Sequence, residues 1–126
     1  MKADREADNI VKPKIRDYSR QLLICTGPRC TQNGEGEALF NALQAKFRAA
    51  GLGVDAGPAR VKRTRTGCVA ACQGGPIVAV QPDGVWYYNV TDENMDRIIE
   101  QHLKGGQIVE ELVFHRNGVE TPEPLL

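Results

Sequence analysis

Two kinds of hydrophobic pattern alternate along this chain, short apolar runs and longer segments with helical spacing. The run at residues 21–24 is Gln-Leu-Leu-Ile, and a continuous apolar run this short predicts a strand buried on both faces in the centre of a sheet. The segment 35–50 instead places Leu39, Leu43 and Phe47 at helical spacing, with two glutamates in its first turn. We therefore expect a strand followed by an amphipathic helix of about sixteen residues.

The middle of the chain predicts three further strands. Residues 59–66 alternate only weakly between apolar and polar side chains, but they lead from a loop into a cysteine-containing segment, and we expect a strand there. Residues 77–80 and 85–90 are rich in β-branched and aromatic side chains, which favours strands. The Gln-Pro-Asp-Gly sequence at 81–84 is typical of a turn, so these two strands are predicted to form a hairpin.

A second helix and a short apolar segment follow the hairpin. Thr91 is a suitable N-cap, and apolar residues at helical spacing run from Met95 to Leu103 before Gly105 ends the helix. Residues 108–114 form another apolar segment, which we interpret as a strand or a docking tail. The order strand, helix, strand, hairpin, helix predicts an α/β fold of the thioredoxin-like kind, a small mixed sheet with helices packed on it.

One domain accounts for most of the chain. With 126 residues, the chain is long enough for a single packed core. Charge dominates residues 1–18 and Pro13 interrupts any helix there, so we expect a loosely ordered N-terminal extension. Residues 19–116 form the predicted domain, and residues 117–126 form a C-terminal tail.

Composition and charge exclude several classes of partner. Sixteen basic and sixteen acidic side chains cancel, so no overall field favours nucleic acid or an anionic membrane. No stretch reaches the length of a transmembrane helix, and the charged amino terminus lacks the apolar centre of a signal peptide. We therefore expect a cytoplasmic protein, whose thiols stay reduced.

Four cysteines form two pairs, and no other feature of the sequence is so concentrated. Cys25 and Cys30 follow the first predicted strand with C-x4-C spacing, and Cys68 and Cys72 have C-x3-C spacing. In a reducing compartment, paired cysteines hold metal or perform redox chemistry more often than they form structural disulfides. A secreted protein with each pair oxidised to a disulfide is the alternative.

Four thiolates can ligate a zinc ion or an iron–sulfur cluster. Structural zinc sites favour closely spaced pairs, whereas the wider spacings here suit a [2Fe–2S] cluster, in which each iron takes two cysteine sulfurs. A structural zinc or metal-carrying interaction module remains the alternative. Glycines beside the cysteines let the backbone approach the sulfurs and donate N–H groups to them; they are Gly27, Gly67, Gly74 and Gly75.

Basic residues lie near the cysteines in the sequence: Arg29, Lys62, Arg63 and Arg65. One interpretation is that they offset the negative charge of a thiolate-ligated cluster or face an acidic redox partner. The other is a solvated basic strand edge that discourages aggregation.

Other chemistry has less support. A thioredoxin-type dithiol requires C-x-x-C at a helix amino terminus, and neither pair has that spacing, so a thiol–disulfide enzyme is only a third hypothesis. His102 and His115 are far from the cysteines in sequence and are expected to be surface or packed residues, not ligands. Trp86 and Tyr87 are interpreted as hairpin packing. The sequence has no phosphate-binding loop or hydrolytic constellation, so we predict that the protein is not an enzyme.

The cysteine motifs resemble those of the thioredoxin-like [2Fe–2S] ferredoxins. C-x4-C follows the first strand, and a G-C-x3-C-x3-P segment with a hairpin comes much later. The resemblance extends from Arg20 to Arg116. The chain is similar both to the free bacterial ferredoxins and to the ferredoxin-like subunit of NADH dehydrogenases. The C-x4-C spacing is closer to the subunit, whereas the amino-terminal helical region of that subunit is missing, so a free carrier and a subunit both remain open.

This resemblance implies one [2Fe–2S] cluster, with Cys25 and Cys30 on one iron and Cys68 and Cys72 on the other. It implies a one-electron carrier that works with a partner oxidoreductase, and often a homodimer. The apolar segment 108–114 is our candidate for the dimer interface.

Overall fold

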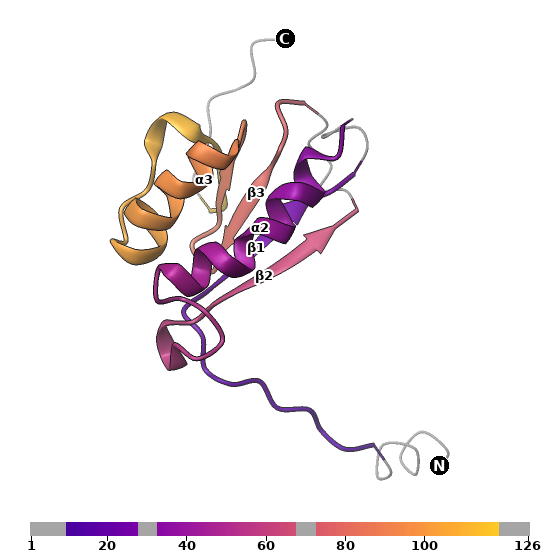
Figure 1. Cartoon of the computed structure of the whole chain (residues 1–126), viewed down its shortest axis with the longest axis vertical. Helices are drawn as coiled ribbons and strands as arrows, with labels where there is room; N and C mark the ends of the chain where they lie inside the picture. The colour runs from indigo at the N-terminus through magenta and orange to yellow at the C-terminus, as the bar shows by residue number, and fades with distance from the viewer. Residues whose placement is uncertain (1–9, 28–32, 68–72, 119–126) are drawn as a thin grey trace.

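A five-stranded mixed sheet is the framework of the computed structural model, which describes residues 10–27, 33–67 and 73–118. The strands lie in the order β2–β1–β3–β4–β5. β1 and β2 run parallel, and the other neighbours run antiparallel (Figure 1). The strand bounds are β1 (Arg20–Cys25), β2 (Val61–Thr66), β3 (Val78–Gln81), β4 (Val85–Tyr87) and β5 (Val113–Arg116).

The first helix connects the two parallel strands. α2 (Glu35–Ala49) buries Leu39, Leu43 and Phe47 against the sheet, as the helical spacing predicted. After α2 the chain passes through the short 3-10 helix η1 (Gly57–Ala59) and enters β2. This β1–α2–β2 unit confirms the predicted strand–helix–strand beginning.

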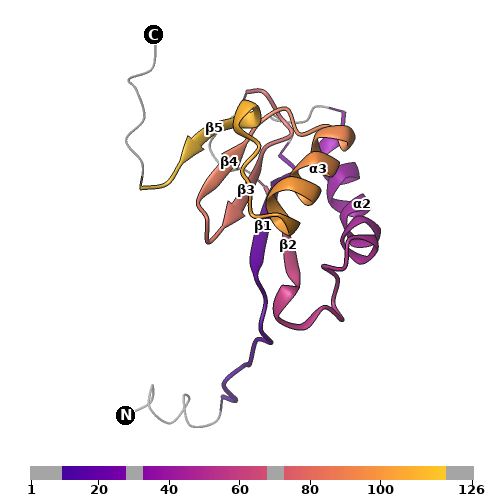
Figure 2. The same cartoon turned by 90° about the vertical axis from the view of Figure 1, so that its left-hand side faces the viewer.

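The second helical segment covers the same face of the sheet as α2 (Figure 2). It consists of α3 (Asp92–Ile98) and a π-helical continuation, η2 (Ile99–Lys104). The Thr91 hydroxyl accepts a hydrogen bond from the Asn94 N–H at 3.2 Å, so the predicted N-cap is confirmed. The side chains between the sheet and these helices form the core, which includes Leu22, Ile24, Leu43, Val78, Val80, Tyr87, Met95 and Ile98.

The other face of the sheet is more open than the sequence predicted. Successive side chains of a strand point to opposite faces, so Leu22 and Ile24 enter the core while Leu23 lies on the other face. Leu22 and Ile24 are fully buried, but Leu23 is only half-buried. The prediction that residues 21–24 are buried on both faces was therefore wrong for this second face, where no helix of the described ranges packs.

Residues 108–114 contribute mainly to this chain's own core. Val109 and Leu112 are buried, and a short 3-10 helix, η3 (Glu110–Leu112), leads into the edge strand β5. Of the two interpretations of this segment, the strand is correct for its last residues. Only Phe114 among its large apolar side chains is strongly exposed.

The two segments that flank the predicted domain are described only in part. Residues 10–18 form no helix or strand and extend away from the sheet (Figure 1), and Ile10, Val11 and Ile15 are largely exposed. The predicted tail lies outside the described residues from position 119 onward. Within the described part of the chain, no helix has both the length and the apolar character needed to cross a membrane.

Candidate metal centre

The carboxyl ends of the two parallel strands bring the beginnings of both cysteine segments together. Cys25, at the end of β1, is the register partner of Thr66, at the end of β2. The next residue, Thr26, donates its backbone N–H to Thr66 O at 2.8 Å, and its hydroxyl donates to the same oxygen at 2.9 Å. The chain then continues toward Cys30 from one strand and toward Cys68 from the other.

The returning chain also passes beside Cys25. The Cys25 N–H donates to Ile77 O at 3.0 Å, just before β3. The carbonyl of Gly74 accepts a hydrogen bond from the Asn89 N–H at 2.6 Å, which holds the segment after the second cysteine pair to the end of the hairpin. The described flanks of both cysteine pairs therefore meet at one end of the sheet.

Only one of the four predicted ligands falls within the described ranges. Cys25 is fully buried, whereas Cys30, Cys68 and Cys72 lie outside the described residues. Within those ranges, no three His, Cys, Asp or Glu side chains come together as a metal site. The part of Cys30, Cys68 and Cys72 in a metal centre therefore stays a prediction.

Two glycines allow the close approach of the loops. A Cβ atom on Gly27 would lie 2.1 Å from Gly67 O, which no real contact permits, and 3.7 Å from Cys25 Sγ. The backbones of the two loops are therefore in direct contact beside the Cys25 sulfur, and the expected donation of glycine N–H groups to the sulfurs stays a prediction. Such close backbone approach is a feature of sites that cradle a bulky inorganic group.

A threonine hydroxyl at the same place lacks a partner. Thr66 Oγ1 is the buried side-chain polar atom without a hydrogen-bond partner among the described residues. Register partners on neighbouring strands direct their side chains to the same face, so Thr66 and Cys25 share a face of the sheet. Leaving a buried hydroxyl unpaired costs about 1–3 kcal/mol, whereas a sulfur acceptor at this position would satisfy it. The sequence analysis did not identify Thr66, and only its place directly before Gly67 and Cys68 could have suggested it.

The basic residues of β2 are held along that strand by their own partners. Lys62 Nζ lies 4.8 Å from the centre of the Tyr18 ring. The Arg63 guanidinium donates to Phe40 O at 3.0 Å and lies over the Phe40 ring, and Arg65 forms an ion pair with Glu37 of α2. These contacts hold the basic side chains along β2 and agree with either interpretation. Arg29 lies outside the described residues.

His102 is a packed residue, which is one of the two places that the sequence predicted for it. It is fully buried on η2. Its Nδ1 is 2.7 Å from the Tyr87 hydroxyl and its Nε2 is 2.6 Å from Asp83 Oδ2. Asp83 in turn accepts hydrogen bonds from Arg20 Nε at 3.2 and 3.1 Å. The Tyr87 hydroxyl also accepts a hydrogen bond from the Val109 N–H at 3.1 Å. We call these five residues the His102 network.

Comparison with known proteins identifies the family. The sequence profile of the thioredoxin-like [2Fe–2S] ferredoxins matches residues 15–103 of this chain. The chain belongs to this family. A ferredoxin carries electrons on an iron–sulfur cluster and is not an enzyme, so the predicted family, electron-carrier function and [2Fe–2S] cofactor are confirmed.

Individual ferredoxins agree with the profile. The chain is 57% identical over 53 residues to a 2Fe–2S ferredoxin of Aquifex aeolicus, which covers 42% of this chain and 48% of that protein. It is 37% identical over 112 residues to a putative 2Fe–2S ferredoxin of Priestia megaterium, covering 86% and 83%. The matches to the Aquifex protein and to a Clostridium pasteurianum ferredoxin span about half of those relatives.

The ferredoxin fold is shared with solved structures. A thioredoxin-like [2Fe–2S] ferredoxin from Aquifex aeolicus superimposes with a TM-score of 0.67 and 34% identity, over 81% of this chain and 96% of that one. The wild-type crystal structure from the same organism gives a TM-score of 0.66 and 36% identity, over 79% and 99%. The thioredoxin-like fold predicted from the element order is confirmed.

Proposed function

We propose that Cys25, Cys30, Cys68 and Cys72 hold a single [2Fe–2S] cluster and that the chain passes one electron at a time to or from a partner oxidoreductase. The observation that carries this proposal is the meeting of both cysteine flanks beside the buried Cys25. The family resemblance implies that Cys25 and Cys30 ligate one iron and that Cys68 and Cys72 ligate the other. When bound, the cluster supplies the one-electron chemistry.

The surrounding residues would set the reduction potential. Burial of Cys25 keeps water from its sulfur, and a less polar environment disfavours added negative charge. The Thr66 hydroxyl acts in the opposite direction, because a hydrogen bond donated to a sulfur stabilises the more negative, reduced state. Gly27 keeps the space between the Cys25 sulfur and the Gly67 backbone free of a side chain.

Replacing Thr66 with valine is expected to lower the midpoint potential by roughly 20–60 mV. Valine keeps the shape of threonine but removes the hydroxyl. If the lost hydrogen bond favours the reduced state by about 0.5–1.5 kcal/mol, that range follows from about 59 mV per tenfold change for one electron. A redox titration followed by electron paramagnetic resonance measures it.

The matched control is Thr64→Val. Thr64 precedes Thr66 by two residues on the same face of β2, but its hydroxyl accepts a hydrogen bond from Gln21 Nε2 at 2.8 Å. We expect its potential to equal that of the unsubstituted protein. An unchanged potential in Thr66→Val, or equal shifts in both variants, would show that Thr66 does not donate to the cluster.

We further propose a homodimer formed through an aromatic patch on the open face and edge at β4 and β5. The patch consists of Trp86, Tyr88, Phe114 and His115, whose rings meet edge to face with centroids 6.3–6.5 Å apart. Tyr88 and Phe114 are 40% and 42% exposed. A contiguous exposed apolar surface of this kind favours a protein contact, so Phe114 replaces the whole 108–114 segment as the proposed interface.

Phe114→Glu is expected to convert this dimer to monomers, because the new charge would have to be desolvated at the interface. Size-exclusion chromatography with light scattering should give twice the chain mass of 13.8 kDa for the unsubstituted protein and a single chain mass for the variant. Ile15→Glu is the control, since Ile15 is 69% exposed and lies outside the patch. An unsubstituted protein that runs as a monomer at high micromolar concentration would rule out the dimer.

The cytoplasm is the proposed location. Four cysteines destined for a cluster must remain as thiols until it is inserted, and a reducing compartment keeps them so. The chain composition gives no support for nucleic acid or membrane partners, since the formal net charge is zero.

A further inference from the structure

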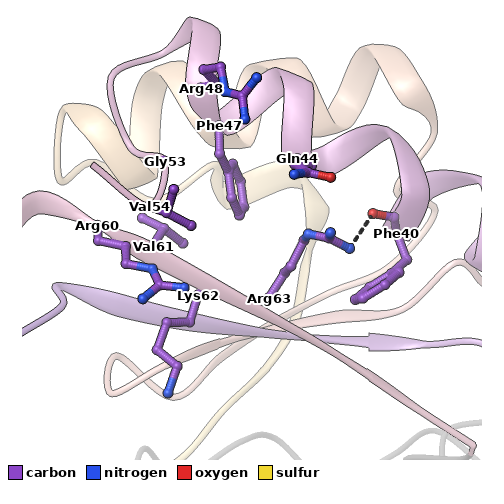
Figure 3. Close-up of a pocket in the computed structure, with 10 residues that line it drawn as sticks. All are labelled: Phe40, Gln44, Phe47, Arg48, Gly53, Val54, Arg60, Val61, Lys62 and Arg63. Atoms are coloured by element: carbon purple, nitrogen blue, oxygen red, sulfur yellow. Dashed lines mark hydrogen bonds between the residues drawn. The ribbon is translucent and has the colours of Figure 1, made fainter. Parts of the chain in front are cut away.

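A groove separates α2 from the outer edge of β2 (Figure 3). Its volume is about 250 Å³. The rings of Phe40 and Phe47 and the side chain of Val61 give it an apolar floor, and three arginines stand at its margins, Arg48, Arg60 and Arg63. We call this feature the β2–α2 groove.

The charge in the β2–α2 groove is unbalanced. None of the described residues that line the groove is acidic. Within the described ranges, no acidic side chain forms an ion pair with Arg48, Arg60 or Arg63. Arg65, two residues after Arg63 on β2, is instead paired with Glu37. Because the chain as a whole is neutral, the positive character belongs to this groove and not to the protein in general.

The backbone beside the groove is also open to a partner. β2 is the terminal strand of the sheet. Thr66 O accepts from Thr26 and so faces β1, whereas the Val61 N–H donates to Leu52 O at 3.0 Å on the outer side. The backbone N–H and C=O groups of successive residues point to opposite sides of a strand. The N–H and C=O groups of Arg63 and Arg65 therefore face the outer edge, where the described residues add no further strand.

We propose that the β2–α2 groove binds an extended acidic segment of a partner protein, which adds to the outer edge of β2 as a further strand. Main-chain hydrogen bonds to Arg63 and Arg65 give such a segment affinity, and alternate side chains project toward the groove and give specificity. Carboxylates at those positions meet Arg48 and Arg60. This site is separate from the metal centre and does not depend on the proposed ligands.

A peptide fits this surface better than a nucleic acid does. An open strand edge presents carbonyl acceptors as well as N–H donors, and a phosphate backbone has no donor for the carbonyls. A nucleic-acid surface also needs many cations along a backbone path, whereas only four basic residues line this groove among the described ones, Arg48, Arg60, Lys62 and Arg63. The competing explanation is that basic side chains on an edge strand prevent association, in which case no peptide binds.

The test is a binding titration on the full-length, cluster-loaded protein with a fluorescein-labelled octapeptide of alternating glutamate and valine. Fluorescence anisotropy should show saturable binding that weakens as salt is raised. Arg48→Glu and Arg60→Glu should each weaken it at least fivefold. Lys104→Glu is the matched control, because this substitution reverses the same charge outside the groove. Lys104 lies on η2, where it pairs with Glu100. The control substitution should leave the affinity unchanged.

Hydrogen exchange of the same complex tests the strand geometry. Peptide binding should slow exchange of the Arg63 and Arg65 amides, and an alternating lysine and valine peptide should not. No saturable binding, equal effects of Arg60→Glu and Lys104→Glu, or unprotected Arg63 and Arg65 amides would overturn the proposal, as would tighter binding of a single-stranded oligonucleotide. Iron and sulfide content, measured on every variant, separates this result from a failure of the proposed cluster ligation.

Discussion

Replacing Cys25 with alanine is expected to give a protein that no longer retains its cluster. The side chain is fully buried where the flanks of both cysteine pairs meet, so no other donor can take its place without moving β1. Loss of an outer-shell partner already costs a metal site roughly 10–100-fold in affinity, and loss of a ligand should cost more. Iron and acid-labile sulfide per chain, with the visible absorbance, measure the effect.

Cys25→Ser separates the loss of a ligand from the loss of packing. Serine is close to cysteine in size and supplies an oxygen ligand in place of the sulfur. This variant should therefore hold more iron than Cys25→Ala and show a shifted spectrum. Far-ultraviolet circular dichroism should confirm that both variants keep the fold. Full iron content and an unchanged spectrum in Cys25→Ala would remove Cys25 from the ligand set.

The His102 network predicts the largest loss of stability. The Tyr87 oxygen accepts from Val109, so its own proton is available for His102 Nδ1, and His102 Nε2–H then donates to Asp83. Burial tends to raise the pKa of Asp83, but the hydrogen bonds from His102 and Arg20 outweigh it and leave that pKa below its ordinary value. His102 therefore joins a buried tyrosine to a carboxylate whose pKa is held low.

His102→Ala is expected to lower the free energy of unfolding by about 3–5 kcal/mol, measured by urea denaturation. It leaves a cavity, and the proton of the buried Tyr87 hydroxyl loses its acceptor while the hydrogen bond from Val109 remains. Gln101→Ala is the matched control. Gln101 is exposed on the same helical segment, η2, and the change there should stay within about 0.5 kcal/mol. Tyr87→Phe should cost much less in the His102→Ala background than alone, because partners in one network are not additive. Equal effects of His102→Ala and Gln101→Ala would contradict the network.

The sequence predicted the elements whose pattern follows from burial on one face. Leu39, Leu43 and Phe47 of α2 face the sheet because their spacing matches the helix repeat. The prediction that Leu23 is buried failed, because an apolar run cannot show which face of a strand lacks a covering helix. β2 alternated only weakly because Arg63 and Arg65 occupy the helix-covered face, where Phe40 and Glu37 receive them.

The sequence suggested four ligands for the candidate site, and these stay a prediction, but it did not suggest their surroundings. Cysteine spacing and neighbouring glycines are visible in the sequence, and they led to the cluster. The Gly27–Gly67 contact and the unpaired Thr66 hydroxyl depend on the register between β1 and β2, which no local pattern encodes. His102 lies 15 residues from Tyr87 and 19 from Asp83, so only the folded chain shows that it is the centre of a buried network.

Metal analysis of protein purified without oxygen tests the central claim most directly. Iron, acid-labile sulfide and zinc are measured on one sample, together with its visible spectrum before and after reduction. Cluster ligation by the four cysteines predicts a red-brown protein with two irons and two sulfides per chain, whose colour bleaches on reduction. A colourless protein with one zinc per chain, or a metal-free protein with reactive thiols, would contradict it.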